Sequence, residues 1–309
     1  MLVDRRGPCN HLAGVDPADP LVMEVLLAPS AGFCLGVRRA VERAVSVAAE
    51  STDPVYTDGP LIHNPGMLAS LEKLGVHMAS DPAAVPAGSV LLIRAHGIPP
   101  ERRRFLDGLP LRLCDATCPE VARIQGFIRA RVARGRSILI LGDDGHAEVV
   151  GLLGHAQGFG RVISGPADVA ALPDDLGPVT LVSQTTQDVS LFRKVADAVL
   201  ERFPDAEILD TICAATKSRQ SELADLAEKA DAIVVVGSST SANSVRLAEI
   251  AGRSRPSILV RGPEDIKPER FAGMRCVGLT AGASTPDDTI AAVRDRLRSL
   301  PPATEANLP

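Results

Sequence analysis

Short apolar runs alternate with helical patterns along most of this 309-residue chain. The runs hold consecutive Val, Ile and Leu residues, as do strands that are buried on both faces. This alternation predicts an α/β fold in which helices cover parallel sheets on both sides. An N-terminal strand is expected within 21–29, and the other predicted strands are 89–95, 137–142, 179–184, 232–237, 257–262 and 275–282. The predicted helices are 36–50, 119–134, 191–203, 216–230, 241–253 and 287–299.

Charge and apolar content exclude several classes of protein. A formal net charge of −5 argues against nucleic-acid binding, which favours a basic surface. No apolar run reaches the roughly 18 residues that a membrane span requires, and the N-terminus lacks the features of a secretory signal. We therefore expect a cytoplasmic protein, in which cysteines serve as ligands, catalysts or free thiols rather than in disulfides.

Three of the six cysteines stand at the predicted start of a helix. They are Cys34, Cys118 and Cys213, in the segments "GFCLGV", "DATCPE" and "DTICAA", and they are 84 and 95 residues apart. The spacing predicts three related units that contribute one cysteine each. Helix N-termini favour thiolates, and three thiolates suit zinc or an iron–sulfur cluster with one open position. Three buried structural cysteines are the alternative from spacing alone.

The other cysteines lack this context. Cys276 lies in an apolar strand and is expected in the core, whereas Cys114 is expected to be a strand-end residue. Cys9 lies in the polar N-terminal extension and is given no role.

Three histidines follow strand-like runs and lie beside Gly or Pro in turns. They are His63, His96 and His146, and we expect them to share a polar pocket. Glu148 follows His146 by two residues, so in an extended segment both side chains would point to the same side. Such a carboxyl group is a candidate general acid, and a solvated helix-start glutamate is the alternative. A zinc deaminase is excluded because no P-C-x-x-C segment follows.

Three loops are rich in Ser, Thr and Asn and follow predicted strands, within 183–187, 234–249 and 278–290. Backbone N–H groups and hydroxyls at a helix N-terminus can bind a phosphate. The loops match neither the Walker nor the dinucleotide-binding pattern, which argues against ATP and NAD. Ordinary helix caps would have the same composition.

Together these segments resemble the LytB family of 4-hydroxy-3-methylbut-2-enyl diphosphate reductases. The similarity extends over about residues 25–298, in the segments "GFCLGVRRAV", "HNP", "RAHGIP", "DATCP", "GHAEVVG", "SQTTQ", "ICAATKSRQ", "VVVGSSTSANSVRLAE" and "TAGASTPD". The resemblance implies three similar α/β lobes in a pseudo-threefold arrangement around a central iron–sulfur cluster. The implied parts are an extension (1–20), an N-terminal strand packing with the third lobe (21–35), three lobes (36–118, 119–209 and 210–299) and a tail (300–309).

The resemblance also implies a set of site residues. Cys34, Cys118 and Cys213 would bind three irons of a [4Fe–4S] cluster, whose fourth iron would bind the substrate hydroxyl. Glu148, Thr185 and His146 would be catalytic, with protons passing from Glu148 through Thr185 and the substrate itself. The implied substrate-binding residues are His63, His96, His146, Thr185, Ser241, Asn243 and Ser284.

The reaction implied is reductive removal of the hydroxyl group, giving isopentenyl and dimethylallyl diphosphates, with ferredoxin or flavodoxin as electron donor and with no nucleic-acid or membrane partner. Partly protonated histidines would make binding depend on pH. Ala147 and Ala242 depart from the family pattern, in which proline and a second serine are common. A non-catalytic iron–sulfur or zinc redox sensor on the same scaffold is the alternative.

Overall fold

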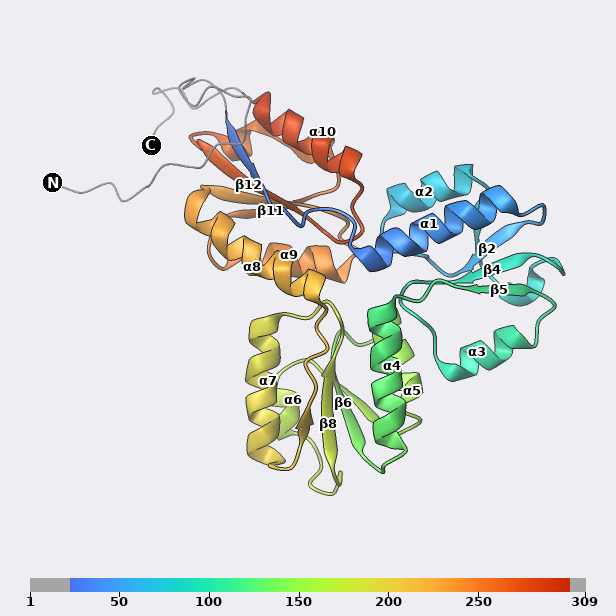
Figure 1. The fold of residues 1–309 in the computed structure, drawn as a ribbon. Helices are drawn as coiled ribbons and strands as arrows, with labels where there is room; N and C mark the ends of the chain where they lie inside the picture. Colours follow the sequence, from blue (N-terminus) through green and yellow to red (C-terminus); the bar gives the residue numbers. More distant parts are fainter. Residues whose placement is uncertain (1–22, 301–309) are drawn as a thin grey trace. The chain divides into compact units, whose positions relative to one another are not determined.

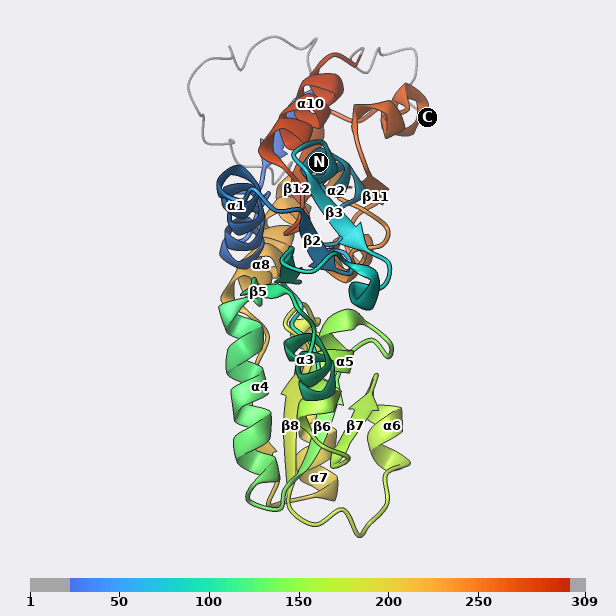
Figure 2. The ribbon, with the colours of Figure 1, turned by 90° about the vertical axis from the view of Figure 1, so that its right-hand side faces the viewer.

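The computed structural model describes residues 23–300, which form three four-stranded sheets (Figures 1 and 2). All the strand pairs among these residues are parallel. The α/β class predicted from the alternating pattern is therefore confirmed. Among the described residues, no helix has both the length and the apolar content to cross a membrane.

The first sheet along the chain has the order β3-β2-β4-β5. Its strands are β2 (Val55–Asp58), β3 (Val76–Ala79), β4 (Val90–Ile93) and β5 (Arg112–Asp115). Helices α1 (Leu35–Glu50) and α2 (Pro65–Lys73) cover one face. Helix α3 (Pro100–Asp107) covers the other face, where Leu106 packs on Leu91 and Ile93. The short 3-10 helix η1 (Pro82–Ala84) precedes β4.

The second sheet has the order β7-β6-β8-β9. Its strands are β6 (Ser137–Leu141), β7 (Gly160–Ile163), β8 (Val179–Ser183) and β9 (Glu207–Ile208). Helices α4 (Pro119–Val132) and α5 (Ala147–His155) pack on one face. Helices α6 (Pro166–Ala170) and α7 (Val189–Arg202) pack on the opposite face (Figure 1).

The third sheet is completed by the N-terminal strand, in the order β11-β10-β12-β1. Its strands are β10 (Ala232–Val236), β11 (Ser257–Val260), β12 (Cys276–Ala281) and β1 (Glu24–Leu27). Helices α8 (Ala214–Lys229) and α9 (Ala242–Gly252) cover one face, and α10 (Asp287–Arg298) covers the other. The 3-10 helices η2 (Pro263–Asp265) and η3 (Pro268–Phe271) lie between β11 and β12.

The same strand order recurs in all three sheets. In the first two, the strand that comes first lies beside the third, and the fourth is at one edge. In the third sheet the N-terminal strand β1 takes that edge position beside β12. Between the two central strands the chain order reverses, and parallel sheets bind ligands beyond the carboxyl ends of the strands at such a point. The central strands also end in register, so that their following loops emerge side by side, at Asp58 and Ile93, Leu141 and Ser183, and Val236 and Ala281.

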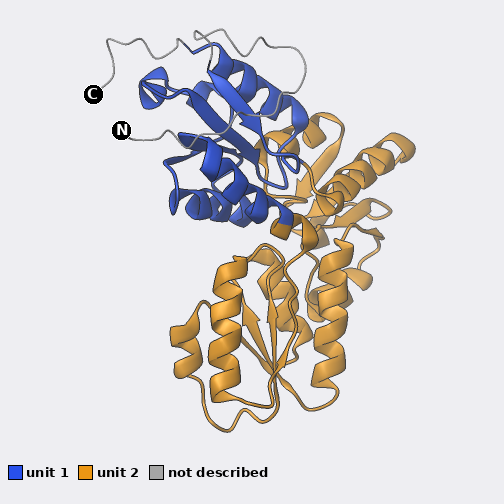
Figure 3. Ribbon diagram, turned by 60° about the vertical axis from the view of Figure 1, so that its left-hand side comes forward, with its two compact units in different colours: residues 1–32, 218–309 blue, residues 33–217 orange. Residues whose placement is uncertain are grey.

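The chain forms two compact units, each defined by the residues that contact one another within it (Figure 3). Unit 1 comprises the described residues up to Gly32 and from Ser218 onward, and unit 2 comprises Phe33–Lys217. Unit 2 holds the first two sheets and unit 1 holds the third. The boundaries of the three predicted lobes stay a prediction.

Most predicted elements are present within a few residues of their expected ends, whereas several short ones escape the sequence pattern. The missed elements are β2, β3, β5, β7, β9, α2, α3, α5 and α6. Cys276 lies buried in β12, as expected, and Cys114 is a buried residue of β5. Cys9, the extension and all of the tail beyond Leu300 lie outside the described residues.

Candidate active site

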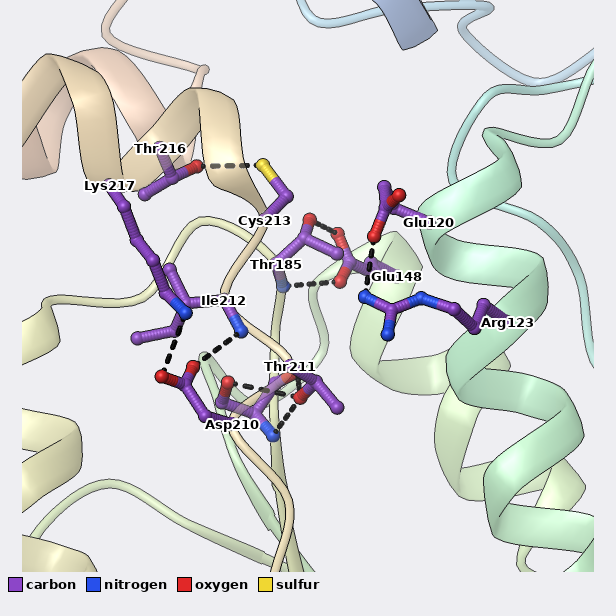
Figure 4. A network of polar contacts seen from close by, with 11 residues as sticks. Glu120, Arg123, Glu148, Thr185, Asp210, Thr211, Ile212, Cys213, Thr216 and Lys217 are labelled. Atoms are coloured by element: carbon purple, nitrogen blue, oxygen red, sulfur yellow. Dashed lines mark hydrogen bonds and ion pairs between the residues drawn. The ribbon is translucent and has the colours of Figure 1, made fainter.

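The three cysteines occupy equivalent places, each after an edge strand of one sheet. Cys34 follows β1, Cys118 follows β5 and Cys213 follows β9. Cys34 and Cys118 are the N-cap residues of α1 and α4, and Cys213 directly precedes α8. The Cys34 sulfur accepts a hydrogen bond from the Val37 N–H at 3.4 Å, and the Cys213 sulfur lies 3.1 Å from the Thr216 hydroxyl (Figure 4). All three side chains are half-buried.

Cys34 and Cys118 both lie next to Gly36, and Cys213 is near enough for its charge to act on Cys118. A Cβ atom placed on Gly36 would lie 2.5 Å from the Cys118 sulfur and 4.0 Å from the Cys34 sulfur. Burial raises the pKa of Cys118, whereas hydrogen bonds from the N–H groups of Glu120 and Val121 lower it. The nearby charges of Cys34 and Cys213 raise it further. Burial is also the first cause of the raised pKa of Cys213, to which Cys34 and Glu148 add.

These raised pKa values contradict the expectation that helix N-termini alone favour thiolates here. Burial outweighs the N–H groups, so Cys118 and Cys213 are thiols when no cation is near. A metal supplies the missing positive charge and deprotonates its thiol ligands. Three converging half-buried sulfurs therefore match the donor set of a soft metal centre such as an iron–sulfur cluster.

The three histidines of the sequence prediction also come together in unit 2. The ring centres of His63 and His96 are 4.4 Å apart, and that of His146 lies 5.2 and 5.5 Å from them. One ring nitrogen of each lies within 4.8 Å of the others, a set that can bind a divalent metal or donate hydrogen bonds to an anion. The three histidines lie together on the loops after β2, β4 and β6, and the polar pocket that they are expected to share stays a prediction.

Burial sets the protonation of this histidine group. It lowers the pKa of His63, with a further contribution from Arg94. It lowers the pKa of His96 well below the usual value, with contributions from the neighbouring charges of His63, His146 and Arg94. These lowered pKa values argue against the partly protonated histidines expected at these two positions, because burial and neighbouring positive charge disfavour the cations. His146 accepts from the Glu148 N–H through Nδ1 at 3.2 Å, which assigns the proton of the neutral ring to Nε2.

Gln125 of α4 packs against the loop that carries His96. Gly97 adopts a φ of +70°, which favours glycine. A side chain there would also collide with Nε2 of Gln125. Gln125 is buried and also faces Gly151 of α5. No motif marks this glutamine, and the sequence prediction missed it.

Glu148 is the most deeply buried carboxyl group of this site, only 3% exposed. Its two oxygens accept from the Thr185 N–H at 2.6 Å and the Thr185 hydroxyl at 2.7 Å (Figure 4). Burial raises the pKa of Glu148 to about 7, while the hydrogen bonds from Thr185 act in the opposite direction. The alternative of a solvated helix-start glutamate is therefore excluded.

Residues 146–148 are not an extended segment, the condition under which the two side chains would point to the same side. His146 is the N-cap of α5 and Glu148 lies in the first turn of that helix. The carboxyl group reaches the site because the helix begins directly after the β6 loop. Asp143, in the loop between β6 and α5, contributes to the site through its charge, which further raises the pKa of Glu148.

The Ser- and Asn-rich loops of unit 1 follow the central strands β10 and β12. Ser241 is the N-cap of α9 and accepts from the Ser244 N–H at 3.4 Å. Asn243 is 5% exposed, and its Nδ2 group donates to no atom of the described residues. Ser284 is also buried, in the loop after β12. These groups can bind an anion at a helix N-terminus.

Two glycines hold the first turn of α9 against the strand ends. A side chain on Gly237 or on Gly282 would collide with the hydroxyl group of Ser244, which lies between them. Both glycines follow central strands, β10 and β12 respectively. The close packing places the N–H groups of α9 at the carboxyl edge of the third sheet.

Known proteins share these features along nearly the whole chain. Residues 25–298 match the family described as LytB protein. The chain belongs to the LytB family. A LytB relative in Opitutus terrae, named 4-hydroxy-3-methylbut-2-enyl diphosphate reductase, is 41% identical over 290 residues, covering 90% of this chain and all of that protein. The Aquifex aeolicus protein of the same name is 35% identical, over 90% of this chain and 97% of its own.

Solved LytB structures agree with the fold. The reductase from Plasmodium falciparum superposes with a TM-score of 0.85 at 29% identity, covering 88% of this chain and 87% of that chain. A second structure is described as the reductase that is the terminal enzyme of the non-mevalonate pathway. It has a TM-score of 0.66 at 34% identity, over 89% of this chain and 99% of that one. Membership of the LytB family implies an iron–sulfur cofactor, for which the three thiols are the candidate ligands.

Proposed function

We propose that this chain reduces 4-hydroxy-3-methylbut-2-enyl diphosphate to isopentenyl and dimethylallyl diphosphates. The allylic C–O bond breaks, two electrons and two protons are taken up, and the hydroxyl oxygen leaves as water. One observation carries the proposal beyond the family name. Unit 2 combines three converging thiols with a buried carboxyl group whose pKa of about 7 suits proton donation at neutral pH.

In this proposal Cys34, Cys118 and Cys213 bind a [4Fe–4S] cluster and leave one iron without a protein ligand. When bound, the cluster supplies the electrons and a Lewis-acidic iron for the substrate hydroxyl. Their place at helix N-termini lets nearby N–H groups offset part of the thiolate charge.

Glu148 is the proposed proton donor. At neutral pH a carboxyl group with a pKa of about 7 is protonated in a large fraction of molecules. The Thr185 hydroxyl lies 2.7 Å from the carboxyl oxygen. It can accept the proton of Glu148 while it donates its own hydroxyl proton to the substrate. His146 caps the helix that carries Glu148, and it presents an Nε2–H group as a donor.

The diphosphate is proposed to bind through uncharged donors. His63, His96 and His146 offer imidazole N–H groups, while Ser241, Asn243 and Ser284 offer hydroxyl and amide groups. Hydrogen bonds to a charged phosphate are stronger than those between neutral groups, so neutral donors suffice for affinity. Ferredoxin or flavodoxin as electron donor, a cytoplasmic location and the three-lobed arrangement about the cluster are part of the same proposal.

The alternative, a non-catalytic iron–sulfur or zinc redox sensor, has less support. A sensor needs the thiols but has no use for a buried acid held by two hydrogen bonds from Thr185. Burying such a group costs stability at pH 8, which a sensor would have no reason to retain.

The test is anaerobic purification, iron and sulfide analysis, and an assay with the allylic diphosphate and a strong reductant. We expect about four irons and four sulfides per chain, and release of both products. Cys213→Ala should lose most of the iron and the activity, whereas Cys276→Ala, the same change in the buried core of unit 1, should retain both. A colourless zinc protein, or a loaded protein that leaves the substrate unchanged, would contradict the proposal.

A further inference from the structure

Gly36, the second residue of α1, lies against a cysteine of another helix. A Cβ atom at this position would be 2.5 Å from the sulfur of Cys118 and 3.3 Å from its Cβ. Real Cβ atoms do not approach a heavy atom to within 3.0 Å, so a larger residue requires the sulfur to move. The same Cβ would lie 4.0 Å from the sulfur of Cys34, so Gly36 is adjacent to both thiols.

The backbone at Gly36 does not require glycine. Gly36 is not among the residues with a positive φ, and it lies within a regular helix where alanine is favoured. Gly32 and Gly97, in contrast, have φ values of +107° and +70°. The need for glycine at position 36 therefore comes from the neighbouring sulfur and not from the chain conformation.

We propose that Gly36 is a positioning residue for the metal centre. Its missing side chain lets the first turn of α1 approach the first turn of α4 closely enough for Cys34 and Cys118 to bind one cluster. The inference rests on the proposed function, because it assumes that these two thiols share a cluster.

Metal binding decides how much a side chain at position 36 costs. In the metal-free protein the Cys118 side chain is held by no metal and can turn to another staggered rotamer to make room. In the loaded protein a bond to iron holds the sulfur in place, so the methyl group and the sulfur compete for the same space. We therefore expect Gly36→Ala to fold normally and to bind the cluster poorly.

Gly126 provides a matched control in α4. A Cβ atom there would meet only the end of the Arg129 side chain, at 3.9 Å. Both substitutions introduce alanine into a helix, with a comparable gain in helix propensity of up to about 1 kcal/mol. They differ in the contact with Cys118.

The experiment is anaerobic reconstitution of wild type, Gly36→Ala and Gly126→Ala with iron and sulfide, followed by gel filtration. Bound iron, acid-labile sulfide and the visible and electron paramagnetic resonance spectra are measured, and thermal unfolding is followed for the metal-free proteins. For Gly36→Ala we expect cluster affinity to fall about 10- to 100-fold, as when the support of a metal ligand is disturbed. Its metal-free unfolding temperature should equal or exceed that of wild type, and Gly126→Ala should bind iron normally.

Three outcomes would overturn the inference. The first is full iron content with a wild-type spectrum in Gly36→Ala. The second is a metal-free Gly36→Ala protein that unfolds well below wild type, since glycine would then serve the fold itself. The third is equal loss of iron in Gly126→Ala. Cys118→Ala distinguishes failure of the proposed ligand set from failure of the role of Gly36. If Cys118→Ala retains the whole cluster, the proposed ligand set is wrong. If it loses the cluster while Gly36→Ala retains it, only the role of Gly36 is wrong.

Discussion

The two units of the molecule share one backbone arrangement but carry different side chains on it. In both, parallel strands lead into loops that end at helix N-termini, where free N–H groups are available. In unit 2 three of these N-cap residues carry sulfur or imidazole groups, Cys34, Cys118 and His146, beside the oxygen-bearing caps Asn64 and Asp188. In unit 1 the N-cap residue of α9 is the hydroxyl group of Ser241.

This difference in chemistry implies a division of labour. Thiols bind soft metals and the nearby carboxyl group moves protons, whereas hydroxyl and amide groups bind an anion. Substitutions in unit 2 should therefore reduce turnover, and substitutions in unit 1 should weaken substrate binding. The following predictions test that division, from the largest expected effect to the smallest.

Glu148→Gln should reduce kcat by about 10²- to 10⁴-fold, because the amide cannot donate the required proton. The iron content and visible spectrum should stay at wild-type values, since the residue is not a cluster ligand. Thr185→Val, which retains the backbone N–H and removes the hydroxyl, should give a smaller loss. Glu101→Gln, an exposed first-turn glutamate of α3, serves as control and should leave kcat unchanged. Retained turnover in Glu148→Gln would rule out this proton donor.

Asn243→Asp should raise KM about 10- to 100-fold, equivalent to about 1.4–2.8 kcal/mol of binding free energy. The change replaces a buried amide donor with a carboxylate that repels the diphosphate. Asn243→Ala, which removes the donor without adding charge, should raise KM less. Steady-state kinetics on reconstituted protein measure both. A fall in kcat with an unchanged KM would break the proposed division between the units.

Activity should decline as pH rises above about 7, because Glu148 must be protonated to act as an acid and its pKa is about 7. Asp143→Asn removes a negative charge that raises this pKa, so the declining limb should move to lower pH. At pH 8 activity should fall relative to wild type, by about threefold for each half unit by which the pKa falls. Asp144→Asn, in the exposed neighbouring residue, should leave the profile unchanged. A shift to higher pH in Asp143→Asn would contradict the assignment.

Ala242→Ser should have the smallest effect. We expect KM to fall by at most about threefold, because the added hydroxyl would contribute a single, partly exposed hydrogen bond to substrate binding. Ala242 is half-buried at the start of α9, at the position where the resemblance to the LytB family implies a second serine. The added hydroxyl would extend the anion-binding loop of unit 1 without affecting the iron content of unit 2. An increase in KM would show that the loop has no room for it.

The sequence alone determined the features that depend on local pattern. Continuous apolar strands predicted parallel sheets, and Pro119 after Cys118 marked a helix start, because strand burial and helix capping are read from neighbouring residues. Short elements escaped prediction: α5 contains Gly151 and Gly154, which weaken its helical pattern. Gly154 is tolerated there because its missing side chain admits Pro99.

Only the tertiary structure decided how distant groups act on one another. It brought Glu148 and Thr185 together, and the burial that raises the pKa of Glu148 has no counterpart in a linear pattern. It placed His63, His96 and His146 in one group, where burial lowers the pKa of the first two. It also set Gly36 against Cys118, a contact across two helices whose residues are 82 positions apart. Desolvation and close packing depend on three-dimensional surroundings, which is the physical reason that the sequence could name these residues without predicting their chemical state.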